Sequence, residues 1–210
     1  DVPSCANTLQ WYAETIDKTY GDIGPTAPNA LSMVTREPIG VVAAIVPWNY
    51  PLIITAWKLG AALATGNSVV LKPASQSPLS ALRLAELATE AGLPDGVLNV
   101  VTGPGAILGD ALARHPGVDK IAFTGSTEVG VRVMQAAAER IEKVSLELGG
   151  KSPNVVFDDA DLDVCIEKSF WSVFDNAGQD CCARSRQFVQ RGVYEDFVER
   201  LAARTARTVV

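Results

Sequence analysis

The chain has 210 residues, of which 48% are hydrophobic and 20% are charged, so it is long enough to bury the core of one domain or one and a half. Its net charge of −6, without a basic block, argues against nucleic acid or an anionic membrane as a partner. No bilayer-length apolar run and no secretory leader is recognisable in the sequence, so we expect a soluble, cytoplasmic protein that acts on small molecules.

Helical patterns run into both ends of the chain. Residues 5–15 favour a helix that no capping residue precedes, and residues 194–210 keep a helical pattern to the last position. We therefore expect the chain to be part of a longer protein.

Between these ends, apolar runs of strand length alternate with helix-length segments. The predicted strands are 40–48, 68–73, 97–103, 120–125 and 143–150, and the predicted helices are 53–65, 77–92, a short one ending at 114, and 126–140. Ser77 is the expected cap of the second of these helices. Strands that are continuously apolar are buried on both faces, which predicts an open parallel α/β sheet covered by helices. A strand at 154–159, a helix at 161–174 and a strand at 186–190 predict the start of a second α/β domain.

Polar and glycine-rich residues lie at the carboxyl ends of the predicted strands, where open α/β sheets bind their ligands. They are Asn49, Lys72, residues 103–105, residues 124–126 and residues 147–150. Lys72 is either a surface lysine or a cation directed at a ribose or phosphate. Glu147 either reaches solvent or is partly buried at a strand end, and burial would raise its pKa toward that of a general base.

Three glycine-rich stretches resemble parts of nucleotide-binding motifs. In "GPGAILG" (103–109) the third glycine is one place late for a dinucleotide loop, and in "GGKS" (149–152) Ser145 stands where a phosphate loop needs glycine. In "FTGSTEVG" (123–130) a strand is predicted to end at Gly125 and a helix to begin at Ser126, so either a diphosphate binds there or this is an ordinary strand-to-helix turn.

The four cysteines are too few and too irregularly spaced for a disulfide framework, and we expect no metal site. Cys181 and Cys182 lie in the polar stretch "NAGQDCCARSR" (176–186), where a thiol nucleophile is plausible and two inert packing residues are the alternative. A cysteine hydrolase is disfavoured, because the only histidine, His115, lies in an exposed-looking loop.

Five ordered motifs together resemble the aldehyde dehydrogenase superfamily, with the match running from Arg36 to Val189. They are "PWNYP" (47–51), "LKPA" (71–74), "FTGSTEVG" (123–130), "ELGGKSPN" (147–154) and "NAGQDCCARSR". The family's dinucleotide fold lacks the usual G-x-G-x-x-G. The resemblance implies an N-terminal helical and linker segment at 1–35, a dinucleotide-binding domain at 36–148 and the first part of the catalytic domain at 149–210.

By this resemblance the chain is an NAD(P)-dependent oxidoreductase that converts aldehydes to acids. Cys181 is the nucleophile, the Asn49 amide and the Cys181 backbone N–H hold the oxyanion, and Glu147 deprotonates the water that releases the acid. The branch that passes the acyl group to coenzyme A is disfavoured by Glu147. Since family members are more than twice this length, the alternative is a non-catalytic nucleotide-binding fragment. The parent enzyme is expected to be a homo-oligomer.

The resemblance also implies an NAD or NADP site, with Lys72 at the adenosine ribose. Lys72 is expected to be one of the catalytic residues as well. The expected cofactor residues are Val46, Pro47, Trp48, Lys72, Ala74, Ser75, Gly105, Gly109, Phe123, Thr124, Gly125, Ser126, Val129, Leu148 and Gly149. NAD-preferring members commonly have a glutamate where this chain has Ser75, and losing a carboxylate removes repulsion toward a 2′-phosphate. We therefore expect dual use with an NADP lean.

The substrate is expected to be an ω-aminoaldehyde such as 4-aminobutyraldehyde or a γ-glutamylated relative. The expected substrate residues are Tyr50, Trp57, Asp175, Asp180 and Cys182. An acidic and aromatic surface suits an ammonium group. The alternative is that Trp57 is common to the family and that the two aspartates only shape the loop.

Overall fold

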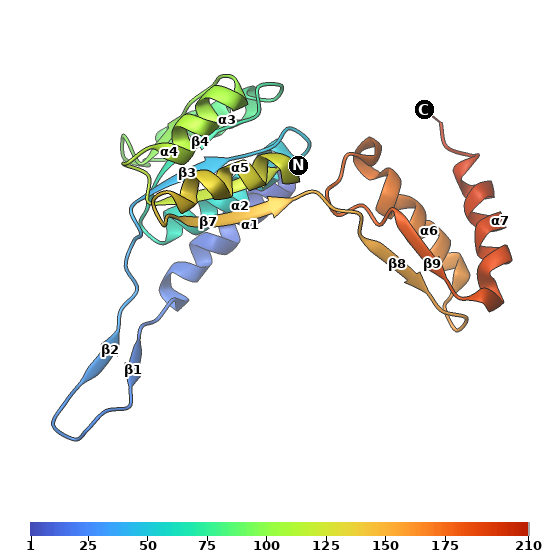
Figure 1. Ribbon diagram of the computed structural model, residues 1–210, viewed down its shortest axis with the longest axis horizontal. Coiled ribbons are helices and arrows are strands. Elements are labelled where there is room, and N and C mark those ends of the chain that lie inside the picture. The colour runs from blue at the N-terminus through green and yellow to red at the C-terminus, as the bar shows by residue number, and fades with distance from the viewer. Residues whose placement is uncertain (210) are drawn as a thin grey trace. The chain divides into compact units, whose positions relative to one another are not determined.

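A computed structural model describes residues 1–209, which form two compact units, Asp1–Glu147 and Leu148–Val210. The first unit contains a five-stranded parallel sheet in the order β5-β4-β3-β6-β7 (Figure 1). Its strands are β3 (Val41–Ile45), β4 (Ser68–Lys72), β5 (Leu98–Val100), β6 (Lys120–Gly125) and β7 (Lys143–Leu148). The predicted α/β class and parallel sheet are confirmed.

Helices connect the strands of this sheet. They are α2 (Pro51–Ala64), α3 (Leu79–Glu90), a π-helical turn η2 (Gly105–Gly109) that continues into α4 (Asp110–Arg114), and α5 (Thr127–Ala138). Helix α2 ends where the sequence predicts, because Gly66 adopts a left-handed φ of 77° that most other residues avoid. The core lies between α2 and the middle of the sheet, where Val69, Leu71 and Leu59 are almost completely buried.

Three predicted features of the first unit are wrong. The Ser77 hydroxyl does not cap α3: it is buried and has no hydrogen-bond partner among the described residues, because α3 begins only at Leu79. β7 is not buried on both faces, since alternate residues along it are exposed. The segment predicted as a linker contains the antiparallel hairpin β1 (Asp22–Gly24) and β2 (Ser32–Val34), which the short, interrupted apolar pattern did not indicate.

Two N-terminal elements complete the first unit. Helix α1 (Val2–Thr15), followed by the turn η1 (Ile16–Lys18), packs on α2. The carboxylate of Asp1 accepts hydrogen bonds from the backbone N–H groups of Leu52 (2.9 Å) and Ile53 (3.0 Å) at the start of α2. A residue distant in sequence therefore caps the helix that follows Asn49 and Tyr50.

The second unit has a two-stranded parallel sheet, β8 (Pro153–Val156) and β9 (Arg186–Val189). Its helical elements are α6 (Leu162–Phe174), η3 (Asp175–Gly178), η4 (Arg191–Val193) and α7 (Tyr194–Thr205). Asp161 caps α6 by accepting from the backbone N–H of Asp163 and Val164, and Phe197 of α7 is buried against Val156. Among the described residues, no helix is both long and apolar enough to cross a bilayer.

Candidate active site

The strand register brings the expected cofactor residues to one edge of the first unit's sheet. Ile45 of β3 pairs with Lys72 of β4 on one side and with Phe123 of β6 on the other, so the segments that leave these three strands start side by side. The expected residues on these segments and on the first turn of α5 are Val46, Pro47, Trp48, Lys72, Ala74, Ser75, Phe123, Thr124, Gly125, Ser126 and Val129.

Lys72 is not a surface lysine. It is only 3% exposed, its Nζ donates to the Pro73 carbonyl at 2.9 Å, and burial lowers its pKa. A Cβ added to Gly105 would lie 3.9 Å from this Nζ, so the lysine lies beside η2, while a Cβ added to Gly109 would meet open space. The Ser75 hydroxyl donates to the Gly103 carbonyl at 3.0 Å, which joins the ends of β4 and β5.

The β6–α5 turn has the predicted form, with β6 ending at Gly125 and the Ser126 hydroxyl accepting from the Val129 N–H at 3.3 Å. A Cβ on Gly125 would lie 2.5 Å from the Phe123 ring, so a larger residue there would require this buried ring to shift. The Thr124 hydroxyl is buried with no partner in the part of the chain that the structure describes. A glycine-lined helix start beside an unsatisfied hydroxyl fits an anionic, hydrogen-bonding ligand such as a dinucleotide.

The pKa of Lys58 on α2 is shifted by its surroundings. Burial lowers the pKa of Lys58 on α2 to about 8, although the nearby Glu147 carboxylate works in the opposite direction. Glu147 itself is exposed, so of the two alternatives the sequence left open the residue takes the one that reaches solvent, on the open face of the alternating strand β7. Lys58 could not be singled out from the sequence, where it resembles any other lysine in a helix.

The expected aromatic substrate residues occupy different environments in the first unit. Tyr50 is half-buried and packs on the core, whereas Trp57 is 52% exposed. Trp57 lines a surface hollow of about 380 Å³ together with Asn7, Thr8, Trp11 and Tyr12 of α1. Sequence reasoning missed the α1 side of this hollow, because α1 and α2 are brought together only by packing.

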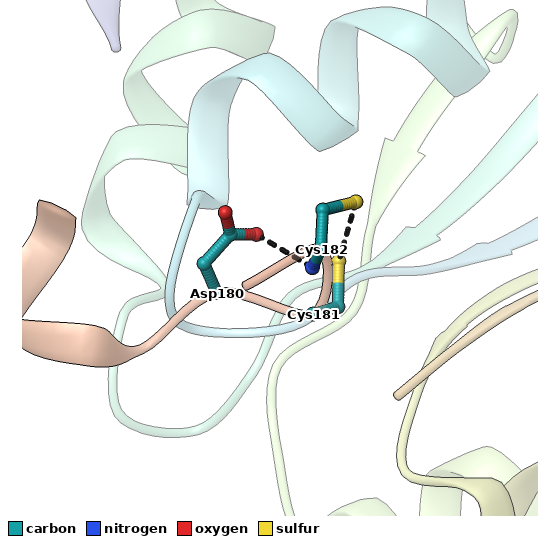
Figure 2. Close-up of side chains that lie close together, drawn as sticks. All are labelled: Asp180, Cys181 and Cys182. Carbon is teal, nitrogen blue, oxygen red and sulfur yellow. Dashed lines mark hydrogen bonds between the residues drawn. The ribbon is translucent and has the colours of Figure 1, made fainter. Parts of the chain in front are cut away.

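The expected nucleophile lies in the loop of the second unit that precedes β9. Cys181 is half-buried and Cys182 is exposed, which argues against two inert packing residues. The Sγ atoms are 3.8 Å apart, and a carboxylate oxygen of Asp180 accepts from the Cys182 N–H at 2.9 Å (Figure 2). Asp175 likewise accepts from the Asn176 N–H at 2.9 Å, so both aspartates shape the loop.

The pKa of the Cys181 thiol is raised to about 11, and burial is the largest cause. The hydrogen bond between the two thiols and the charges of Cys182 and Asp180 act in the same direction. A thiol with this pKa is almost fully protonated at neutral pH. The loop presents a thiol that needs a proton acceptor before it can attack.

The backbone around the loop is held at both ends. Before the cysteines, Asn176 and Ala177 adopt left-handed φ angles of 49° and 56°, which are uncommon outside glycine. After them, the Arg184 N–H donates to Ser172 of α6 at 3.0 Å. The expected cofactor residues Leu148 and Gly149 begin this unit, and a Cβ on the following Gly150 would lie 3.3 Å from the Cys181 carbonyl oxygen.

Comparison with known proteins gives consistent matches. The model of the family described as "Aldehyde dehydrogenase family" matches residues 1–210. The NADP/NAD-dependent aldehyde dehydrogenase PuuC of Escherichia coli (strain K12) is 52% identical over 200 residues, which cover 94% of this chain and 40% of that protein.

Two solved structures superpose closely. The gamma-glutamyl-gamma-aminobutyraldehyde dehydrogenase from Burkholderia cenocepacia J2315 has 51% identity and a TM-score of 0.96, covering 100% of this chain and 43% of that one. An NAD+ complex of an aldehyde dehydrogenase from Bacillus cereus has 45% identity and a TM-score of 0.97, with the same coverage of 100% and 43%. The chain thus spans about two fifths of the length of these relatives.

Proposed function

The chain belongs to the aldehyde dehydrogenase family, and we propose that the protein oxidises an aldehyde to the carboxylic acid through a thioester on Cys181, with hydride transfer to NAD(P). The observation that carries this proposal is the family match over residues 1–210, within which the motifs containing Asn49, Glu147 and Cys181 occur in order. In the proposed organisation, residues 36–148 bind the dinucleotide and residues 149–210 form the first part of the catalytic domain.

The carboxyl edge of the sheet fits the proposed cofactor. Lys72 supplies a buried cation beside Gly105, and the Ser126-capped start of α5 supplies backbone N–H groups for a diphosphate. The buried Thr124 hydroxyl offers an unsatisfied hydrogen-bonding group at the same edge. When bound, the oxidised nicotinamide accepts the hydride that leaves the substrate.

In the proposed reaction, the Cys181 thiol loses its proton to a base and its sulfur forms a bond to the aldehyde carbon. The carbonyl π-electrons move to oxygen, where the Asn49 amide and the Cys181 N–H stabilise the charge. When the C–H electron pair departs as hydride, the C=O bond re-forms as a thioester. Glu147 then takes a proton from water, the resulting hydroxide attacks the thioester, and the C–S bond breaks to release the acid and the thiolate. The exposed position of Glu147 is compatible with access to water.

Formation of reduced cofactor from a simple aldehyde tests the proposal on the protein at its native length. We expect turnover in the unaltered protein and none in Cys181→Ser. Cys165→Ser is the matched control, because this thiol lies on α6 outside the cysteine loop. Equal rates in Cys181→Ser and the unaltered protein would overturn the proposed nucleophile.

We propose dual cofactor use with a lean to NADP. The support is Ser75, whose hydroxyl is engaged with Gly103 and which brings no carboxylate to repel a 2′-phosphate. PuuC, the E. coli relative, is itself described as NADP/NAD-dependent. The ratio of kcat/KM for the two cofactors tests this, and a strong NAD preference would defeat it. Ser75→Glu should move the ratio toward NAD.

The proposed substrate class is an ω-aminoaldehyde. Its support is the half-exposed Trp57, whose ring can attract an ammonium group by about 0.5 to 2 kcal/mol, and the B. cenocepacia relative named for an aminobutyraldehyde. Asp175 and Asp180 each accept a hydrogen bond from a backbone N–H group. The proposed recognition of the ammonium group therefore depends more on Trp57 than on these two aspartates. Equal kcat/KM for neutral aldehydes of the same length would contradict it.

A second candidate function is nucleotide binding without catalysis. It is favoured by the length of the chain, which spans about two fifths of the relatives that it matches. Calorimetric binding of NAD or NADP without formation of reduced cofactor would support this alternative. We further propose that the protein is a cytoplasmic homo-oligomer, which size-exclusion chromatography with light scattering and fractionation of cells would test.

A further inference from the structure

We propose that Asp180, Cys181 and Cys182 form a binding site for a thiophilic divalent cation, and that Zn²⁺ is its physiological ligand. The sequence spacing gave no such expectation, because adjacent cysteines match no zinc motif. One ligand atom from each of the three side chains lies within 4.8 Å of the others, and no other group of three or more His, Cys, Asp or Glu residues is so close among residues 1–209. Two thiolates and one carboxylate are a donor set that selects soft or borderline cations over Mg²⁺ and Ca²⁺.

The distance between the two sulfur atoms matches tetrahedral coordination. A Zn–S bond of about 2.3 Å and a tetrahedral angle place two bound sulfurs about 3.8 Å apart. The Sγ atoms of Cys181 and Cys182 are already 3.8 Å apart and face each other (Figure 2). A cation therefore needs no rearrangement of the two sulfurs relative to each other.

The same geometry disfavours the obvious alternative, a disulfide between the two thiols. An S–S bond is about 2.0 Å long and usually joins residues whose Cα atoms are at least about 4.4 Å apart. Consecutive Cα atoms across a trans peptide are only about 3.8 Å apart. Oxidation would have to distort the backbone, whereas chelation keeps it.

The third ligand is held next to the sulfurs by the loop itself. A carboxylate oxygen of Asp180 accepts from the Cys182 N–H at 2.9 Å, and the Ala183 N–H donates to the Asp180 carbonyl at 3.3 Å. Ala183 is buried and the next N–H, that of Arg184, is anchored on α6, so the turn is fixed from behind. Such constraints lower the cost of ordering ligands around a cation.

Binding exchanges protons for the cation. Each Zn²⁺ that enters forms two Zn–S bonds and one Zn–O bond, and the two thiol protons pass to the buffer; no electron is transferred. The fourth tetrahedral position remains for water. Because the electron pair of Cys181 is then engaged with zinc, a reversible block of aldehyde oxidation follows. This consequence rests on the proposed function, but binding itself does not.

Binding is tested on the chain with reduced thiols, using Cd²⁺ as the spectroscopic probe and Zn²⁺ as the competitor. We expect a thiolate-to-cadmium absorption band that saturates at one equivalent and is abolished by Zn²⁺. Cys182→Ser should weaken binding by at least about 100-fold and Asp180→Asn by about 10-fold. Cys165→Ser, the matched control, should leave the affinity unchanged. Absence of the band, or equal weakening by Cys165→Ser, would overturn the site.

A second measurement needs no variant and so does not depend on altered chains folding. Bound Zn²⁺ should protect Cys181 and Cys182 from alkylation in peptide mass spectra while Cys165 remains as reactive as before. A mass lower by two hydrogens on the peptide containing both cysteines would show a disulfide and overturn the site. Inhibition is measured on the protein at native length, with each rate expressed relative to the metal-free rate of the same protein. Zn²⁺ should inhibit aldehyde oxidation by the unaltered protein, and it should inhibit Cys182→Ser far less. Protection without inhibition would retain the site and contradict only its link to catalysis.

Discussion

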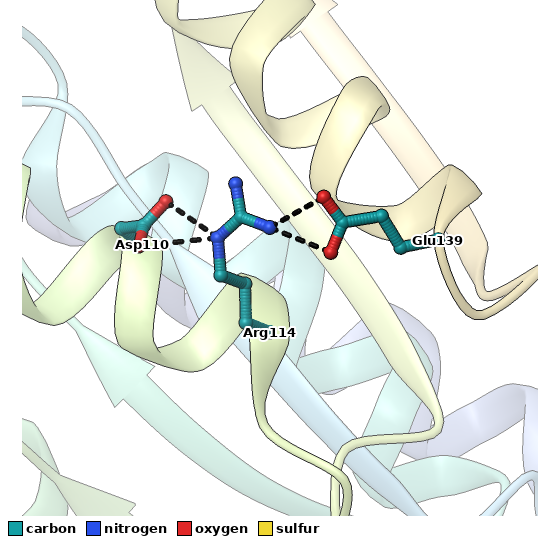
Figure 3. A network of polar contacts seen from close by, with 3 residues as sticks. All are labelled: Asp110, Arg114 and Glu139. Atoms are coloured by element: carbon teal, nitrogen blue, oxygen red, sulfur yellow. Dashed lines mark hydrogen bonds and ion pairs between the residues drawn. The ribbon is translucent and has the colours of Figure 1, made fainter.

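The carboxyl edge of the five-stranded sheet and the cysteine loop hold their polar groups by different means. At the sheet edge, Lys72 and Thr124 lie at the carboxyl ends of β4 and β6, whose positions are fixed by parallel pairing with β3. The segment after β5 is tied to α5 by Arg114, which bonds Asp110 at 3.1 Å and Glu139 at 2.7 Å (Figure 3). In the cysteine loop, left-handed residues and side-chain caps replace strand pairing.

This difference separates two requirements of the proposed chemistry. A nucleotide needs a fixed array of backbone and side-chain donors, which a sheet edge provides with little conformational freedom. A nucleophile needs a group whose protonation changes during the reaction, and a half-buried thiol next to a second thiol and a carboxylate provides that. We therefore expect perturbations of the loop to alter reactivity and perturbations of the regular elements to alter stability.

The largest expected effect concerns the pH dependence of the cysteine loop. With a pKa of about 11, the thiolate fraction of Cys181 rises about tenfold per pH unit, or about 1,000-fold between pH 7 and pH 10. The rate of alkylation by iodoacetamide, followed on the Cys181 peptide by mass spectrometry, should rise in proportion. A rate that is constant over this range would show that the thiolate already predominates at neutral pH.

The same experiment distinguishes burial from the neighbouring thiol as the cause of the raised pKa. Burial is the largest contribution, and the hydrogen bond and charge of Cys182 come next. Cys182→Ala should therefore lower the pKa of Cys181 only in part, so that the steep section of the profile moves to lower pH. An unchanged profile would assign the shift to burial and Asp180 and none of it to Cys182.

Removal of the largest fully buried side chain of the second unit should have the next largest effect. Phe197 is 2% exposed, and Phe197→Ala should cost about 3 to 5 kcal/mol of unfolding free energy through the cavity it leaves. Phe188→Ala is the matched control, because Phe188 is 51% exposed and its loss should cost less than about 1 kcal/mol. Hydrogen exchange should show the loss at α6, α7, β8 and β9. An equal loss at β3 and β4 would show that both units unfold together.

Lys58 should make the stability of the first unit depend on alkaline pH. Its folded pKa of about 8 is below the usual 10.5, so the unfolded chain binds the proton more tightly. The free energy of unfolding should therefore rise between about pH 8 and pH 10.5, by about 3 kcal/mol relative to Lys58→Met. Denaturant titrations of both proteins measure this difference. Glu147→Gln should lower the Lys58 pKa below about 8, and a rise would contradict the assigned interaction.

Most of the regular structure could be predicted from the sequence. β6 was predicted at its observed limits, and β3, β4 and α2 were predicted within a few residues, because continuous apolar runs and a left-handed Gly66 leave few alternatives. The sequence also singled out the β6–α5 turn and the cysteine pair as chemically distinctive. These features depend on short-range patterns that a single sequence records.

Features created by distant contacts could not be predicted. The cap of α2 comes from Asp1, and the burial of Lys58 follows from packing of α2 within the first unit. The sequence left open whether Glu147 reaches solvent or is partly buried, and only the alternating burial of β7 shows that it is exposed. The raised pKa of Cys181 likewise depends on how the loop folds and not on which residues it contains.

The smallest expected effect tests whether the left-handed backbone before the cysteines is a real cost. Ala177 has a φ of 56°, and a non-glycine residue in this region costs about 1 to 2 kcal/mol. Ala177→Gly removes that cost but adds about 0.4 to 1 kcal/mol of unfolded-state entropy, so we expect a net stabilisation of about 0.5 kcal/mol. Ala177→Val should act in the opposite direction, because a β-branched residue tolerates this conformation less well. Denaturant titration measures both variants, and destabilisation by glycine would show that residue 177 is not left-handed in solution. Since Ala177 lies four residues before Cys181, we expect Ala177→Gly to change the alkylation rate of the Cys181 thiol as well as the free energy of unfolding.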